Sequence, residues 1–350
     1  MLFSSDSGPK HGARLHFERP GSLDGFLPEA FGREGGDLVI ENVAGHSTLG
    51  ERSLAVRYTI RSAGARLRVS VPVFHPERLP GLSACPSLYP GQTLFAAISA
   101  DQGNRTNTIV RHYILHYGAA DGLVTGYGPT EVFRPGQVRD VDWQVPDTGR
   151  QPIASIGLEI STTEPAEGAV YLDYLGWHGE PEAELGRPWT GGNMWLSAWA
   201  GDAVHREPQG DGFRIRQSAG RGILAQGDPV WRDCRIVTTL TAVTDCVRGV
   251  AIRVKSVGDY YALLLGGGKA RLVRMLDGTE KVVADGPWAS PMGKAQGFEL
   301  KANGRFFSGL IDGRQAFSLE DGETVLDCGA VGVVCEAGTM DAGVVTVRAS

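Results

Sequence analysis

The chain has 350 residues, of which 42% are hydrophobic and 21% charged, and its formal net charge is −6. This balance is typical of a folded globular protein and excludes wholesale disorder. Because there is no basic excess, the chain lacks the positive charge that binding to a phosphate backbone needs, which excludes nucleic acid as a partner.

Targeting and redox signals are sparse. No apolar run approaches the ~20 residues that span a bilayer, so no membrane segment is predicted. Residues 1–6 show no basic start followed by an apolar stretch, so no signal peptide is expected. The cysteines are odd in number and lack CxxC spacing, which predicts buried thiols in a reducing, cytoplasmic compartment. Two pairs stay open as disulfides on neighbouring strands, namely Cys234 with Cys246 and Cys328 with Cys335; the fifth cysteine is Cys85.

The first half of the chain shows the period-two alternation of β-strands. Residues 54–60 and 67–71 alternate apolar and polar side chains, and residues 108–117 and 156–160 are rich in β-branched and aromatic residues. No stretch of a dozen residues has the apolar spacing of an amphipathic helix. These patterns predict a β domain over residues 1–180.

The polar, acidic segment 179–188 contains two prolines and is predicted to be an interdomain linker. Beyond it, Asn303-Gly304 and Asp312-Gly313 are strong hairpin signals, and Asp277-Gly278 is a further turn of this type. The four residues 266–269 are predicted to turn between two apolar strands. Residues 181–350 are therefore predicted to form a second β domain, and the fold class is all-β, with two consecutive β-sandwich (jelly-roll) domains.

The first half resembles the galactose-binding-like jelly roll of many carbohydrate-binding modules. The resemblance lies in residues 15–18, 50–56 and 170–177, which include a Phe-Glu pair on the first strand and an apolar-x-Asp-apolar strand at the end. In those modules an early Glu and a late Asp often share a structural calcium ion. Glu18 and Asp173 match these positions, so the resemblance implies a structural Ca²⁺ there.

The second half, from Trp189 onwards, resembles concanavalin A-like and laminin-G-like sandwiches in residues 260–265, 304–313 and 329–335. Both halves in this order, with residues 87–92 and 220–224, resemble the β-rich accessory region of some bacterial ADP-ribosylglycohydrolase-family proteins. The catalytic part of that family is helical and binds magnesium through acidic motifs, and nothing in this chain matches it. The resemblance therefore implies a fold, and it does not imply glycohydrolase activity for this chain.

Candidate ligand-binding residues lie in the second half. Trp195, Trp199 and Trp231 are candidates because sugar rings stack on exposed aromatic side chains; the alternative is that these tryptophans fill the core or the domain junction. Arg214 and Arg216 share one strand face and are candidates for an anion-attracting patch that suits a phosphorylated sugar or ADP-ribose. Further basic residues suggested for this patch are Arg253, Lys255, Arg271 and Arg274. The alternative is solvated strand edges that prevent edge-to-edge pairing.

The sequence contains no recognisable catalytic motif, neither GxSxG nor HExxH nor the paired carboxylates of sandwich glucanases. The favoured function is a non-catalytic carbohydrate- or glycoside-binding accessory module, associated with a glycohydrolase of the ADP-ribosylglycohydrolase type. One alternative is a sandwich-fold glycoside hydrolase or polysaccharide lyase with unrecognised catalytic residues. The other is a purely structural scaffold that buries an interface with a catalytic domain.

Overall fold

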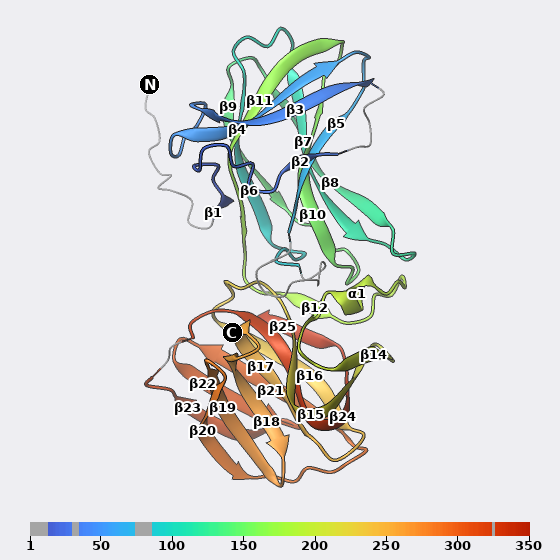
Figure 1. Cartoon of the computed structure of the whole chain (residues 1–350), viewed down its shortest axis with the longest axis vertical. Helices are drawn as coiled ribbons and strands as arrows, with labels where there is room; N and C mark the ends of the chain where they lie inside the picture. The colour runs from blue at the N-terminus through green and yellow to red at the C-terminus, as the bar shows by residue number, and fades with distance from the viewer. Residues whose placement is uncertain (1–12, 30–34, 74–85, 324–325) are drawn as a thin grey trace.

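The computed structural model describes residues 13–29, 35–73, 86–323 and 326–350. Almost all regular structure in these residues is β-strand, which confirms the all-β prediction. The only helix among them is the short α1 (Met194–Ser197), and none is long and apolar enough to cross a membrane. Figure 1 shows two sandwich-like bodies stacked end to end along the long axis.

The first sandwich consists of two antiparallel sheets. In sheet A the strand order is β3 (Gly36–Ala44), β4 (Arg52–Ile60), β11 (Ala166–His178), β6 (Thr93–Ala100) and β9 (Val138–Gln144), with β1 (Ala13–Leu15) paired to β11. In sheet B the order is β2 (Leu27–Pro28), β5 (Leu67–Pro72), β10 (Ile153–Ser161), β7 (Thr108–Tyr117) and β8 (Leu123–Phe133). Alternate residues of both sheets form the core between them, for example Val56, Ile98 and Leu158.

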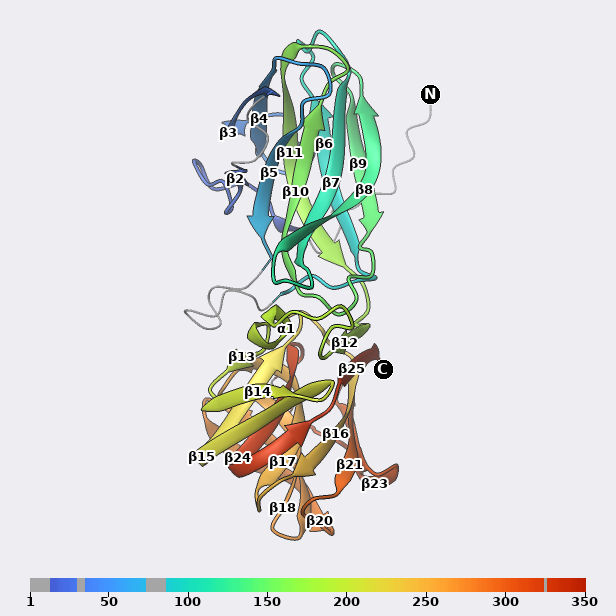
Figure 2. The same cartoon turned by 90° about the vertical axis from the view of Figure 1, so that its right-hand side faces the viewer.

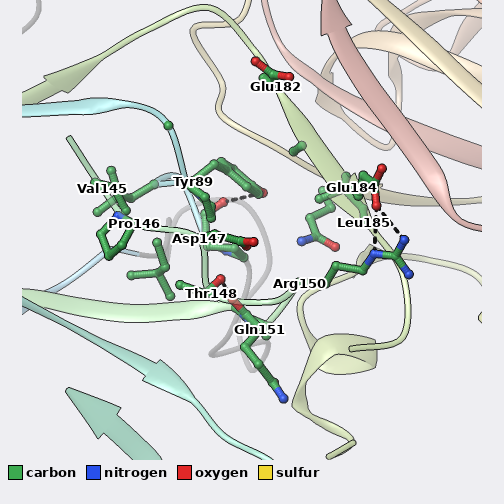
Figure 3. Close-up of a pocket in the computed structure, with 18 of the residues that line it drawn as sticks. Tyr89, Val145, Pro146, Asp147, Thr148, Arg150, Gln151, Glu182, Glu184 and Leu185 are labelled. Carbon is green, nitrogen blue, oxygen red and sulfur yellow. Dashed lines mark hydrogen bonds and ion pairs between the residues drawn. The ribbon is translucent and has the colours of Figure 1, made fainter. Parts of the chain in front are cut away.

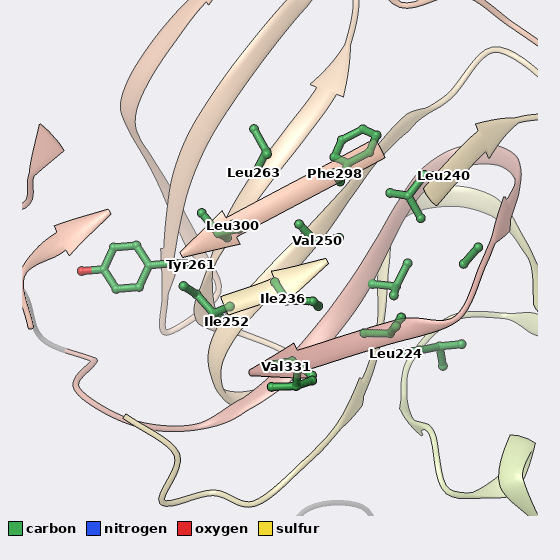
Figure 4. Packing of buried hydrophobic residues seen from close by; sticks show 14 of the residues in the cluster. Leu224, Ile236, Leu240, Val250, Ile252, Tyr261, Leu263, Phe298, Leu300 and Val331 are labelled. Carbon is green, nitrogen blue, oxygen red and sulfur yellow. The ribbon is translucent and has the colours of Figure 1, made fainter. Parts of the chain in front are cut away.

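The second sandwich is one continuous hydrogen-bonded system in which the long β24 (Ala330–Ala342) joins the two layers. One layer contains β13 (Ala200–Gly201), β14 (His205–Gln209), β15 (Gly212–Gln226), β17 (Val247–Ser256), β18 (Asp259–Gly266), β19 (Lys269–Leu276) and β20 (Thr279–Pro287). The other contains β12 (Ala183–Leu185), β16 (Cys234–Ala242), β21 (Ala295–Asn303), β22 (Phe306–Ile311), β23 (Arg314–Glu320) and β25 (Val345–Ala349). Figure 4 shows the apolar core between the layers, which includes Leu224, Ile236 and Phe298.

The predicted turns of the second half are confirmed. β18 and β19 are joined at residues 267–268, and β22 and β23 at Asp312-Gly313. Asp312 and Gly313 have φ of 51° and 74°, so both residues are left-handed, as a tight two-residue hairpin turn requires. Turn chemistry was therefore a sound guide to strand pairing in this half.

The chain leaves sheet A at His178 and enters the second sandwich at Ala183, where β12 pairs with β25. The segment predicted as a linker is therefore partly a strand, because Ala183 and Leu185 alternate into the core while Glu184 points outward. Figure 2 shows α1 and β12 at the junction of the two bodies. The Asp121 carboxylate of the first sandwich accepts the backbone N–H of Asn193 at 2.6 Å, next to the start of α1.

Four cysteines lie in the described residues, and all four are free thiols. Cys234, Cys246 and Cys335 are buried, in accord with the expectation of small apolar side chains. Neither of the two pairs left open as disulfides forms a bond; the Cys246 thiol donates to the Thr339 carbonyl oxygen and the Cys335 thiol to the Gly338 carbonyl oxygen, each at 3.7 Å. Cys85 lies outside the described residues.

Candidate functional site

A cluster of polar and aromatic side chains covers the outer face of sheet B. We call it the tyrosine platform; it consists of Arg68, Arg111, Tyr113, Tyr127 and Glu159. Strand register builds it, because Glu159 on β10 lies directly opposite Arg68 on β5 and Arg111 on β7. Tyr113 on β7 lies opposite Tyr127 on the edge strand β8. Ile156, Leu158 and Ile160 of β10 point the other way, into the core.

The centre of the platform is a carboxylate held between guanidinium groups. Glu159 Oε2 lies 2.8 Å from Arg68 Nη2, and Oε1 lies 2.7 Å from Arg111 Nη2. Arg66 Nε is 3.8 Å from Oε1. Burial by itself raises the pKa of Glu159, but the hydrogen bonds from Arg111 and Arg68 outweigh it and lower the pKa below its usual value. Glu159 is therefore an ionised acceptor that holds both arginines in place.

The aromatic part of the platform packs against these arginines. The rings of Tyr113 and Tyr127 have centroids 6.5 Å apart, and the Arg111 guanidinium carbon lies 3.7 Å from the Tyr127 centroid. Arg68 donates a hydrogen bond to the Tyr127 hydroxyl. The Tyr113 hydroxyl donates to Glu29 Oε1, and burial raises its pKa. Tyr113 is fully buried, whereas Tyr127 is 37% exposed.

A glycine makes room for the Tyr113 ring. A Cβ atom at Gly157 would lie 2.5 Å from both the hydroxyl oxygen and the Cζ atom of Tyr113, and 2.3 Å from the Val69 carbonyl oxygen. No real Cβ atom tolerates such contacts, so only glycine at this position lets the ring lie across β10. The glycine and the ring occupy directly opposite positions on β10 and β7.

The platform is hard to explain as a folding device. An ion pair removed from water seldom adds net stability, because desolvation offsets the attraction between the charges. Here a carboxylate whose side chain is only 4% exposed lies on the face of the sheet turned away from the core. Clusters of partly buried charged groups beside an exposed aromatic ring are a feature of ligand-binding surfaces.

The tryptophans predicted as a sugar platform do not form one. Trp195, Trp199 and Trp231 are 2%, 0% and 3% exposed, so the prediction that a ligand stacks on them is wrong. Trp195 and Trp199 pack on Phe213 in the second core. Trp231 packs on Tyr89 of the first sandwich, with ring centroids 5.0 Å apart. The alternative interpretation, core and junction filling, describes all three.

The predicted anion-attracting patch is neutralised. Arg214 and Arg216 do share a strand face, but Arg214 Nε lies 2.6 Å from Asp341 Oδ1 and Arg216 Nη2 lies 2.7 Å from Glu207 Oε1. Each guanidinium is thus matched by a carboxylate, and the prediction of a patch that attracts anions is wrong. The other suggested basic residues are also paired with acidic side chains: Arg253, Lys255, Arg271 and Arg274.

Glu18 and Asp173 converge on one loop, the β3–β4 connection at residues 45–51. Asp173 Oδ2 accepts the backbone N–H of Thr48 at 2.6 Å and of Leu49 at 2.8 Å. Glu18 Oε2 accepts the backbone N–H of Glu51 at 3.1 Å. Asp173 Oδ1 is buried without a hydrogen-bond partner, as a metal-directed oxygen would be. Among the described residues, however, no group of three or more His, Cys, Asp or Glu is placed to hold a metal ion. The shared calcium site stays a prediction.

Sequence reasoning missed the platform although it identified the strands that carry it. Residues 67–71, 108–117 and 156–160 are predicted as strands, and they carry Arg68, Arg111, Tyr113 and Glu159 at outward positions, whereas Tyr127 lies on β8, which the sequence did not predict. The alternation of residues 67–71 was a usable signal for an outer face. The order β5-β10-β7-β8, which brings Arg68, Glu159, Arg111 and Tyr127 together, is not readable from local pattern.

No family model matches the chain, and no curated protein matches it. Among solved structures, the carbohydrate-binding module CBM66 from Bacillus subtilis is 16% identical over 43% of this chain and 95% of its own, with a TM-score of 0.40. The CBM22-1-CBM22-2 tandem domain of Xyn10C from Paenibacillus barcinonensis is 10% identical and covers 96% of both chains, with a TM-score of 0.35. A galectin-like protein of unknown function from Bacillus subtilis is 10% identical over 49% of this chain and 98% of its own, with a TM-score of 0.39. With so few identities and such low TM-scores, these similarities carry no argument about ligand or activity.

Proposed function

We propose that the chain is a non-catalytic carbohydrate-binding protein and that the tyrosine platform is its binding face. One observation carries the proposal: Glu159, buried and ionised, holds Arg68 and Arg111 directly beside the exposed ring of Tyr127. An aromatic ring offers an apolar surface to a pyranose, while guanidinium and carboxylate groups hydrogen-bond its hydroxyls. The ion-paired arginines are held in one orientation before the ligand arrives, which lowers the entropic cost of binding.

The geometry is unfavourable for glycoside hydrolysis at the same place. A glycosidase needs a carboxylic acid of raised pKa as proton donor, opposite a second carboxylate. Glu159 has the opposite character, since its arginine partners lower its pKa. The Glu29 carboxylate accepts a hydrogen bond from the Tyr113 hydroxyl, so it is not free to act as the second carboxylate. The platform therefore suits recognition of a sugar and not cleavage of one.

ADP-ribose is the second candidate ligand. Arg68 and Arg111 share a single carboxylate, which leaves an excess positive charge for a phosphate or an acidic sugar. A catalytic partner of the ADP-ribosylglycohydrolase type is also part of the proposal, and it rests on the resemblance of the sequence alone. A purely structural scaffold would require none of the platform's charged groups to stay accessible.

Calcium is part of the proposal as a structural ion. Glu18 and the unpartnered Oδ1 of Asp173 would supply its ligands, and the ion would cross-link the β3–β4 loop to β11. Carboxylate oxygens are ligands that Ca²⁺ prefers. The platform does not depend on the ion, because it lies on the other sheet.

Binding is tested by titration calorimetry of the whole chain with xylo-, gluco-, galacto- and fructo-oligosaccharides and with ADP-ribose. Tyr127→Ala and Glu159→Gln are expected to weaken the best ligand at least tenfold. The control Phe306→Ala removes an aromatic ring that is 62% exposed on the second sandwich, and it is expected to bind normally. Loss of affinity in the control, or full affinity in both platform variants, would refute the proposal. If the chain binds none of the probes, the purely structural scaffold becomes the favoured interpretation.

A further inference from the structure

A cavity of about 590 Å³ lies between the two sandwiches. The first sandwich contributes the residues around Tyr89 and the β9–β10 connection from Val145 to Pro152, and β12 of the second sandwich lies opposite them (Figure 3). The second sandwich also contributes Trp189, Gln226 and Arg348. This volume lies within the range of roughly 300–1,000 Å³ that is typical of small-molecule sites. The cavity is distinct from the tyrosine platform, with which it shares no lining residue among those described.

Trp189 gives this cavity an aromatic wall. Its side chain is 69% exposed, whereas Trp195, Trp199 and Trp231 are buried. The guanidinium of Arg150 lies 4.2 Å from the Trp189 ring centroid, so one face of the ring is covered. The other face is open, and an exposed indole of this size is a large apolar surface left in contact with water.

The aromatic wall is held in place by both sandwiches. Arg150 comes from the first, and Glu184 of the second accepts its Nε–H at 3.1 Å and a second hydrogen bond from Nη2 (Figure 3). Gln151 donates to Thr190 Oγ1 at 3.0 Å and to the carbonyl of Gly191 at 2.7 Å, directly after Trp189. The orientation of the ring is therefore fixed only when the two sandwiches are docked.

The charges around the cavity nearly cancel. The described lining residues include two arginines, Arg150 and Arg348, and three acidic residues, Asp147, Glu182 and Glu184. Arg348 lies 3.4 Å from Glu182, and Arg150 is paired with Glu184. A phosphate-bearing ligand would find no unmatched arginine here. The wall of polar oxygens and amides beside an open indole face instead suits the hydroxyls and the apolar face of a neutral sugar.

We infer that the interdomain cavity is a second saccharide site, in which a neutral sugar stacks on the open face of Trp189. Carboxylates and amides of the rim, among them Asp147, Glu182 and Gln226, accept or donate hydrogen bonds to its hydroxyls. The ligand class rests on the proposed function, whereas the position of the site rests on the cavity alone. Two sites on one rigid chain bind a long glycan more tightly than either does alone, because the second contact forms at high effective concentration.

The test is calorimetry of the full chain with the same neutral oligosaccharides, comparing the wild type with Trp189→Ala, Glu184→Gln and Tyr127→Ala. The control is Trp288→Ala, since Arg314 lies over the Trp288 ring at 4.9 Å and Trp288, which packs partly on the second core, does not line the cavity. The wild type is expected to bind two equivalents. Trp189→Ala is expected to lose one of them, Glu184→Gln to weaken it at least threefold, and Trp288→Ala to keep both.

The outcomes separate this inference from the proposed function. If Trp189→Ala keeps the affinity and stoichiometry of the wild type while Tyr127→Ala loses binding, the cavity site is refuted and the platform stands. If Trp189→Ala loses all binding and Tyr127→Ala loses none, the cavity stands and the platform is refuted. Binding that neither variant changes, or no binding by any oligosaccharide, overturns both.

Discussion

Arg14 of the first sandwich forms an ion pair with Asp228 of the second. Arg14 Nη1 lies 3.0 Å from Asp228 Oδ1, and the guanidinium carbon lies 4.1 Å from the centroid of Trp177. The Asp228 side chain is fully buried and that of Arg14 is 16% exposed. Together with the contact between Tyr89 and Trp231, this pair joins the two sandwiches into one unit and keeps the walls of the cavity in register.

Replacing Asp228 by Asn is expected to destabilise the chain by about 3 kcal/mol, because it leaves the Arg14 charge without its buried partner. The measurement is denaturant unfolding, where the two sandwiches are also expected to unfold in separate steps. The control Asp327→Asn removes a partner of Arg232 from a pair in which both side chains are more than half exposed. It is expected to cost less than about 1 kcal/mol. Equal effects in the two variants would contradict the role given to Asp228.

Gly157→Ala is expected to displace Tyr113 from its position across β10 and to cost about 1–3 kcal/mol, the usual range for overpacking. Saccharide affinity should fall with it, because Tyr113 supports Tyr127. Gly286→Ala is the control, since a Cβ atom there meets nothing within 4 Å. Calorimetry and thermal unfolding of both variants measure the difference. Normal binding by Gly157→Ala would show that the platform does not need this packing.

Because His112 is buried, we expect the free energy of unfolding to depend on pH. His112 points into the first core, and burial lowers its pKa to about 4, although Asp142 acts weakly in the opposite direction. Because the folded pKa lies below the unfolded value of ~6.5, the neutral form is favoured by folding and stability falls as the pH drops from 6.5 towards 4. The difference between the folded and the unfolded pKa of His112 limits this loss of stability to about 3 kcal/mol.

His112→Leu should flatten this part of the curve of unfolding free energy against pH, measured relative to the wild type so that carboxylate titrations cancel. The control His205→Ala removes an imidazole whose side chain is about half exposed, and its effect on the unfolding free energy should be small beside that of His112→Leu. An unchanged pH dependence in His112→Leu would show that another group titrates in this window.

Calcium is tested by thermal unfolding with Ca²⁺ and with EGTA. If Glu18 and Asp173 hold an ion, Ca²⁺ raises the melting temperature of the wild type and the shift disappears in Asp173→Ala and Glu18→Ala. A ligand at 100 times its Kd that binds only the folded state adds about 2.7 kcal/mol, which is readily measured. No shift in the wild type would mean that backbone N–H groups and the Thr48 hydroxyl hold these carboxylates without an ion.

The local pattern of the sequence predicted much of the fold. Period-two alternation located β4 and β5, since side chains on a strand alternate between core and solvent whatever its neighbours are. The β-branched and aromatic content of residues 108–117 and 156–160 located β7 and β10. Left-handed residues such as Asp312 and Gly313 marked the hairpins, because few residue types adopt that conformation without strain. These properties depend on each segment and its immediate neighbours, so they are visible in the chain itself.

The sites depended on relationships between distant segments. Whether a tryptophan is core or exposed is decided by what packs on it, and Trp189 is exposed while Trp195, only six positions later, is buried. Glu159 meets Arg68 and Arg111 because β10 lies between β5 and β7, a sheet order set by the whole chain. The sequence by itself determined the strand class and the turns. Only the tertiary structure decided which side chains share a face, because strand pairing brings together residues that are separated by dozens of positions along the chain.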